Sequence, residues 1–267
     1  MYELAVFGNP IKHSLSPAIH IQFAQQTGLK VNYAKILAPL DGFNYSVRQF
    51  IEKGANGFNI TVPFKVDAFN LVTELTLNAK MAGAVNTIKI QENKLIGENT
   101  DGLGLVNDLT QNLGLSLKGK KILILGAGGA TQGIILPLLG QQPSQIMIAN
   151  RTASKAEKLA NEFSKYGPVS GFGLDKIKSE PIDLIINATS ASLDGNMPEI
   201  DSGCADNAIC YDLMYGKQTP FMDWAKDNNA LIISDGLGML VEQAASSFEF
   251  WTQIKPDTHP VIKNLRG

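Results

Sequence analysis

The sequence predicts an α/β protein of two domains, an N-terminal domain with a mainly parallel sheet and a C-terminal domain of Rossmann type. Strand-like and helix-like stretches alternate along both halves of the chain, which is typical of parallel sheets covered by helices. A glycine-rich turn at residues 126–130 also follows a nearly unbroken apolar run and precedes an apolar helix. With 267 residues, the chain is long enough for two modest domains.

The first hundred residues supply the elements of the N-terminal domain. Short apolar runs predict strands at residues 4–7, 31–37 and 57–60. Longer stretches of mixed polarity predict helices at residues 16–27 and 43–53. Ser16 is expected to be the N-cap of the first helix, with Pro17 at its first position. Segments 87–90 and 94–96 flank Gln91-Glu92-Asn93, which predicts a hairpin.

A second set of elements begins at Lys120. Strands are expected at 121–125, 146–149, 182–186, 209–212 and 231–233, and helices from the glycine turn to 139 and over 154–166. Apolar spacing predicts a linking helix over 102–113. We therefore expect one domain over 1–101 and a second over 102–236, with helices from about 237 packing back on the first.

Composition excludes several classes of protein. The formal net charge of −2 and the absence of like-charge runs argue against a nucleic-acid partner. No apolar run approaches the ~20 residues of a spanning helix, and the N-terminus lacks the features of a signal peptide, so no membrane association is expected. Two cysteines cannot build a disulfide framework, which favours a cytoplasmic location. Three scattered histidines make a metal site improbable.

The glycine turn predicts a dinucleotide site. Gly126 and Gly128 stand where the backbone approaches a pyrophosphate at a helix start, although Thr131 occupies the third fingerprint position. After the next strand comes Arg151 rather than the acidic residue that NAD enzymes use, with Lys155 one turn on. A guanidinium there suits a 2′-phosphate, so NADP is the expected cofactor. The alternatives are a structural turn without a ligand and a solvated arginine.

Four N-terminal segments are more polar than packing requires: 14–17, 59–65, 84–87 and 99–102. Each follows a predicted strand, where open sheets bind ligands, and their hydroxyls and amides suit a small polyhydroxylated substrate. Lys65 stands near a helix start, and Asp101 is its candidate partner. The alternatives are that Ser16 only caps a helix, that Asn59 and Asn86 are turn residues, and that Lys65 is a surface lysine.

These stretches, with others, resemble the shikimate/quinate dehydrogenase family. The matching segments run from residue 7 to 243 in the family's order: 7–11, 14–17, 59–65, 83–87, 99–102, 126–130, 150–152, 187–190, 235–240 and Gln243. The resemblance implies a substrate-binding and catalytic first domain and an NADP-binding second domain. It also implies reversible, NADP(H)-dependent reduction of 3-dehydroshikimate to shikimate, a step toward chorismate and the aromatic amino acids.

The resemblance further implies a role for each site residue. Lys65 and Asp101 would manage the proton, and the substrate would be bound by Ser14, Ser16, Asn59, Thr61, Lys65, Asn86, Asp101, Tyr215 and Gln243. The pyrophosphate would lie on Gly126, Ala127, Gly128, Gly129 and Ala130, and the 2′-phosphate end on Asn150, Arg151, Thr152 and Lys155. The nicotinamide would be framed by Ala188, Thr189, Ser190, Leu213, Gly236 and Met239.

Two residues, Leu77 and Leu213, depart from the family pattern, and neither is expected to take part in the reaction. No metal is needed, because Lys65 can polarise the substrate carbonyl. The alternatives are a quinate/shikimate dehydrogenase of broader specificity and a catalytically idle NADP-binding sensor. A monomer or a homodimer is expected.

Overall fold

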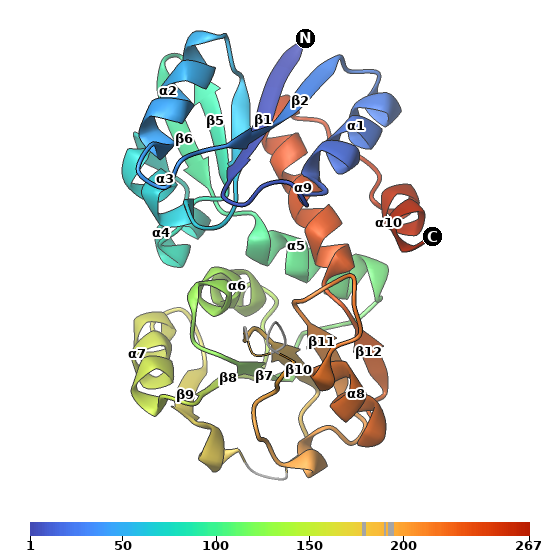
Figure 1. The fold of residues 1–267 in the computed structure, drawn as a ribbon. Helices are drawn as coiled ribbons and strands as arrows, with labels where there is room; N and C mark the ends of the chain where they lie inside the picture. Colours follow the sequence, from blue (N-terminus) through green and yellow to red (C-terminus); the bar gives the residue numbers. More distant parts are fainter. Residues whose placement is uncertain (178–179, 190, 192–194) are drawn as a thin grey trace. The chain divides into compact units, whose positions relative to one another are not determined.

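The structure, a computed structural model, describes residues 1–177, 180–189, 191 and 195–267. It divides into two compact units (Figure 1). Unit 1 comprises residues 1–104 and 240–267, and unit 2 comprises residues 105–239. The chain therefore leaves unit 1 once and returns to it.

Unit 1 is built on a mixed six-stranded sheet with the order β2-β1-β3-β5-β6-β4. The strands are β1 (Tyr2–Gly8), β2 (Val31–Leu37), β3 (Gly57–Ile60), β4 (Glu74–Leu75), β5 (Thr87–Gln91) and β6 (Lys94–Glu98). Strand β1 pairs in parallel with β2 and β3, and β4 pairs in parallel with β6. Strand β5 runs antiparallel to β3 and β6, so the predicted hairpin is confirmed. Glu92 and Asn93 make its two-residue turn with positive φ, as a type I′ turn requires.

Helices cover this sheet and complete its core. They are α1 (Ser16–Thr27), α2 (Phe43–Glu52), α3 (Lys65–Leu71), α4 (Leu77–Ala82), the start of α5 (Asp101–Asn107), most of α9 (Leu237–Thr252), and α10 (His259–Arg266). Ile19 and Phe23 of α1 pack with Val241 and Phe248 of α9, which Figure 1 shows beside α1. The returning segment thus supplies core side chains to the first part of the chain.

The predicted cap of α1 is wrong. The helix begins at Ser16, Leu15 occupies the N-cap position, and no side chain caps the helix. The Ser16 hydroxyl instead lies 3.2 Å from the Ser14 hydroxyl, which donates to it. Ser16 is therefore free of the purely structural role of a cap.

Unit 2 contains a six-stranded, all-parallel sheet with the order β12-β11-β10-β7-β8-β9. The strands are β7 (Lys121–Leu125), β8 (Gln145–Asn150), β9 (Val169–Gly173), β10 (Leu184–Asn187), β11 (Ile209–Asp212) and β12 (Ile232–Ser234), and the helices are α6 (Gly129–Leu139), α7 (Ala153–Phe163) and α8 (Pro220–Asp227). In β7, residues 122–125 are fully buried, as expected of a strand covered on both faces. The predicted class, two α/β domains with a Rossmann-like second sheet, is confirmed.

The predicted linking helix is present in two geometries. Helix α5 continues from Asp108 to Asn112 as a π-helix.

Among the described residues, no helix is long and apolar enough to cross a membrane. The same residues contain no group of His, Cys, Asp and Glu side chains suited to a metal ion.

Candidate functional site

Unit 1 carries a polar cluster where β3, β5 and β6 end or begin. We call the following residues the polar cluster: Asn59, Lys65, Asn86, Thr87, Thr100, Asp101, Gln243 and Ser247. Lys65 is the first residue of α3, and Asp101 is the first residue of α5. Each residue follows a strand by one short turn, Lys65 after the buried β3 and Asp101 after β6, and the sheet brings these turns together.

Lys65 and Asp101 form an ion pair. The Lys65 ammonium donates to Asp101 Oδ2 at 2.6 Å, and the two side chains are 30% and 20% exposed. The other carboxylate oxygen accepts a hydrogen bond of 2.8 Å from Asn86 Nδ2. Asp101 therefore has one donor on each oxygen, and the lysine proton remains within reach of solvent or of a ligand.

Amide groups complete this part of the site. Gln243 Oε1 lies 3.5 Å from both Asn86 Nδ2 and the Thr100 hydroxyl, at the limit of a hydrogen bond. Gln243 Nε2 is held by the Leu240 carbonyl at 2.8 Å. The loose contacts of Oε1 leave that oxygen able to accept from a ligand, such as a substrate hydroxyl.

The serine loop connects to the same cluster through a residue that the sequence analysis missed. Tyr33 of β2 donates to Asn59 Oδ1 at 2.6 Å. Burial raises the pKa of Tyr33 well above its ordinary value, and a hydrogen bond from Ser16 opposes this shift. Asn59 is 6% exposed, and its side-chain amide is held by protein groups, so it belongs to the internal hydrogen bonds of the polar cluster. Thr61 is half-buried, and its side chain packs over Gly8.

In unit 2, the predicted glycine turn opens helix α6. Gly126 has φ +104°, and a Cβ there would lie 3.2 Å from the Ala188 carbonyl oxygen, so a side chain is strained at this position. Gly128 is the N-cap of α6 and has no capping side chain, and residues 128–130 are exposed. The first amides of α6 are therefore free to bind an anion. A Cβ on Gly128 or Gly129 would meet no protein atom, which is the open cradle that a pyrophosphate requires.

The contacts of Thr131 show why a threonine fits the third position of the glycine fingerprint. It is fully buried, and its hydroxyl donates to the Gly126 carbonyl at 2.9 Å. This bond ties the glycine turn to the first turn of α6. In the usual motif, a glycine at this position lets the helix pack closely on the strand. Here the hydrogen bond of Thr131 helps to hold the helix start against the glycine turn.

The segment after β8 presents cationic groups. Asn150 Nδ2 donates to the Thr152 carbonyl at 3.0 Å, which shapes the turn into α7. Arg151 and Lys155 are exposed, and neither forms an ion pair with any described residue. Two exposed cationic side chains, four residues apart in the sequence, fit the 2′-phosphate of NADP.

The remaining predicted cofactor residues lie around the strand ends of unit 2. Ala188 and Thr189 contact the Gly126 turn, and the Thr189 hydroxyl donates to Asn187 Oδ1 at 2.8 Å. A Cβ on Gly236 would lie 2.3 Å from the Leu213 carbonyl oxygen, so these two segments touch. Met239 stands in the first turn of α9, and Tyr215 is 38% exposed after β11. Ser190 lies outside the described residues.

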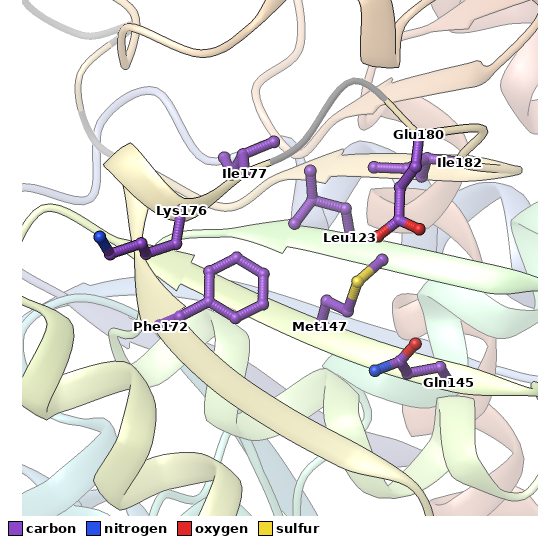
Figure 2. A pocket seen from close by; sticks show the side chains of 8 residues that line it. All are labelled: Leu123, Gln145, Met147, Phe172, Lys176, Ile177, Glu180 and Ile182. Carbon is purple, nitrogen blue, oxygen red and sulfur yellow. The ribbon is translucent and has the colours of Figure 1, made fainter.

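A cavity of about 240 Å³ lies over strands β7, β8 and β9 (Figure 2). Its lining is mixed, polar and apolar, and consists of Leu123, Gln145, Met147, Phe172, Lys176, Ile177, Glu180 and Ile182. The two charged residues are paired with neighbours, Lys176 with Asp175 at 3.4 Å and Glu180 with Lys121 at 3.3 Å. None of the predicted site residues lines it, so we do not assign the chemistry to this cavity.

The glycine cradle and the cationic turn of unit 2 define an α/β protein of the dinucleotide-binding class. Family models match most of the chain: a shikimate dehydrogenase substrate binding domain over residues 6–88, shikimate / quinate 5-dehydrogenase over 108–194, and a shikimate 5'-dehydrogenase C-terminal domain over 236–266. A shikimate dehydrogenase (NADP(+)) of Ruthia magnifica subsp. Calyptogena magnifica is 71% identical over 267 residues, covering 100% of both chains. The chain therefore belongs to the shikimate/quinate dehydrogenase family.

Solved structures agree with this assignment. An Ael1 enzyme from Pseudomonas putida is 40% identical and superposes with a TM-score of 0.95, covering 99% of this chain and 98% of its own. Shikimate 5-dehydrogenase from Thermus thermophilus, in complex with NADP(H) and shikimate, is 30% identical with a TM-score of 0.87, covering 100% of this chain and 99% of its own.

Proposed function

We propose that this protein catalyses the reversible, NADP-dependent reduction of 3-dehydroshikimate to shikimate. The observation that carries the proposal is the Lys65–Asp101 ion pair with Asn86 on its second oxygen. Unit 1 would hold the substrate through Ser14, Ser16, Thr61, Asn86, Asp101 and Gln243, and the family resemblance gives Tyr215 a substrate-binding role as well. Asn59 would support the unit 1 set through its hydrogen bonds to Tyr33, Thr87 and Ser247.

Lys65 is the proton donor in this proposal. Reduction of a ketone builds negative charge on the carbonyl oxygen, and an ammonium within hydrogen-bond reach both stabilises that charge and supplies the proton. Asp101 Oδ2 accepts one hydrogen bond from the Lys65 ammonium at 2.6 Å. The other N–H groups of the ammonium would then donate to the substrate. In the reverse direction, the neutral amine accepts the proton from the substrate hydroxyl.

The cofactor would bind to unit 2. NADPH, when bound, supplies the hydride that reduces the substrate carbonyl carbon. The open amides at the start of α6 would hold its pyrophosphate, while Arg151 and Lys155 would hold the 2′-phosphate. Leu213, Gly236 and Met239, with Ala188 and Thr189, would frame the nicotinamide. This arrangement favours NADP over NAD because no acidic side chain follows β8.

The test is an absorbance assay of the purified protein with shikimate or quinate and with NADP or NAD. We expect turnover with shikimate and NADP, and a strong preference for that pair. Comparable turnover of quinate would favour the broader enzyme instead. Binding of NADP without any turnover would favour a sensor, which the intact Lys65–Asp101 pair argues against. A cytoplasmic location and a monomer or homodimer complete the proposal.

A further inference from the structure

The orientation of the Asn86 side chain is fixed by one backbone group. The Thr100 backbone N–H donates to Asn86 Oδ1 at 3.0 Å, and an N–H can only donate. The amide oxygen of Asn86 must therefore face Thr100. Its nitrogen then faces Asp101 Oδ1, where it donates at 2.8 Å.

Thr87 stands behind the same amide. Its hydroxyl lies 2.9 Å from Asn86 Oδ1, and the side chain is fully buried. Asn59 Nδ2 donates to this hydroxyl at 3.0 Å. The orientation of Asn59 is itself fixed, because its nitrogen also faces the Asn86 carbonyl, which can only accept. Asn59 Nδ2 also lies 3.1 Å from the Ser247 hydroxyl, so its second hydrogen lies between the Thr87 and Ser247 oxygens, with Thr87 the nearer at 3.0 Å.

Ser247 of α9 reaches the Thr87 hydroxyl from another part of the chain. The two oxygens are 2.7 Å apart, and Ser247 is also fully buried. Either hydroxyl is able to donate in this contact, and the Ser247 proton has a second acceptor in reach, the Gln243 carbonyl at 3.0 Å. When Ser247 donates to Thr87, at the shorter of the two distances, both acceptor positions of Thr87 are filled and the Thr87 proton is directed to Asn86 Oδ1.

We propose that Thr87 is a positioning residue for the reaction, with its proton directed by Ser247. Together with the Thr100 N–H, the Thr87 hydroxyl saturates Asn86 Oδ1. Asn86 then presents only N–H donors on its nitrogen, one to Asp101 at 2.8 Å and one that meets the Thr100 hydroxyl at 3.0 Å, whose place an oxygen of the bound substrate would take. The substrate role rests on the proposed function; the orientation of Asn86 does not.

The test compares Thr87→Val, which removes the hydroxyl, with Thr87→Ser, which keeps it. We expect Thr87→Val to raise KM for shikimate about three- to tenfold and to leave KM for NADP within about twofold, because one neutral hydrogen bond is lost in unit 1. Thr87→Ser should recover most of the loss. A purely structural role would lower the active fraction, and hence kcat, without changing either KM.

Ser247→Ala supplies a second variant, with Ser246→Ala as its matched control. Ser246 lies on the same helix, and its hydroxyl is 3.0 Å from the carbonyl four residues earlier, as the Ser247 hydroxyl is, but Ser246 has no contact with the polar cluster. Ser247→Ala should raise KM for shikimate in the same direction as Thr87→Val, and Ser246→Ala should not. Equal KM values for Thr87→Val and the wild type would overturn the proposal, as would equal effects of the two serine variants.

A measurement that does not depend on turnover separates this proposal from the proposed function. The Asn86 side-chain amide signals are assigned in a ¹H–¹⁵N NMR spectrum by their loss in Asn86→Asp. They should move in Thr87→Val and Ser247→Ala but not in Ser246→Ala. Unmoved signals would refute the positioning role. If the wild type fails to oxidise shikimate, the proposed function falls while the amide signals still decide the orientation of Asn86.

Discussion

The His20 ring stacks on the Tyr33 ring, with centroids 4.5 Å apart and an angle of 10° between the planes. Phe23, Phe248 and Trp251 surround the same imidazole. His20 is fully buried, and neither ring nitrogen has a hydrogen-bond partner of normal geometry among the described residues. Burial lowers the pKa of His20 to about 3, and the nearby Asn59 amide opposes the shift only weakly.

This burial predicts acid sensitivity. The unfolded chain binds a proton at His20 below pH 6.5, whereas the folded protein does so only near pH 3. Stability is therefore complete above pH 6.5 and is lost as pH falls toward 3, by up to about 1.4 kcal/mol per pH unit. Urea unfolding between pH 7 and pH 4.5 should show this slope, and His20→Phe should reduce it. The exposed His13→Ala is the control; an unchanged slope in His20→Phe would exclude His20 as its source.

Lys65→Ala should lower kcat at least about a hundredfold while KM for shikimate changes only a few-fold, because the lost proton donor acts mainly in the transition state. Asp101→Asn should lower kcat and also raise KM, since Asp101 holds Lys65 and, in the proposed function, also binds the substrate. Steady-state kinetics measure both effects. Lys80→Ala, an exposed lysine of α4, is the control. Near-normal kcat in Lys65→Ala would mean that another group supplies the proton, and His13→Ala would be measured next.

Arg151→Ala should weaken NADP binding by roughly tenfold to a hundredfold, the value of one charge-assisted phosphate contact, and should leave NAD binding nearly unchanged. Calorimetric titration of both cofactors measures the difference. Lys158→Ala removes an exposed cation further along α7 and should affect neither cofactor. Equal losses for NADP and NAD in Arg151→Ala would contradict a 2′-phosphate contact.

The two glycines of the cofactor turn should respond differently to alanine. Gly128→Ala should keep the unfolding free energy within about 0.5 kcal/mol, because its φ of −97° suits any residue and its Cβ meets no protein atom. It should nevertheless weaken NADP binding at least about tenfold, since the methyl group occupies the cradle. Gly126→Ala should lower the unfolding free energy by about 1–2 kcal/mol because of its positive φ. Thermal unfolding and cofactor titration give both values, and unaltered NADP affinity in Gly128→Ala would place the pyrophosphate elsewhere.

The fold was largely predictable because its strands are short apolar runs ended by strong turn signals. The exceptions have physical reasons. Strand β9 was not predicted. It lies at the edge of the sheet, pairs with β8 alone and has only two large apolar residues, Val169 and Phe172, so its sequence lacks the apolar run of a buried strand. The Ser16 cap failed because a Ser-Pro pair indicates a helix start without fixing which side-chain bond forms there.

For the site, the expectation that every polar segment follows a strand holds for Lys65 and Asp101 and is wrong for Asn86, which immediately precedes β5. The sequence also does not show the hydrogen bonds among the three residues. Tyr33 was hidden because a tyrosine in a strand is ordinarily a packing residue. Ser247 had one available signal: it follows Gln243 by four residues and so lies on the same helix face. Which hydroxyl meets which amide depends on strand register and on the return of α9, and neither is encoded locally.

The return of residues 240–267 to unit 1 has a consequence for how the chain matures on the ribosome. Unit 2 is continuous in sequence, so it can fold as soon as residues 105–239 have emerged from the exit tunnel. Unit 1 begins earlier but lacks Val241 and Phe248 beside Ile19 and Phe23 until α9 has been translated. Unit 1 can therefore complete its core only after α9 has been made, although its synthesis begins first, whereas unit 2 needs no residue beyond 239.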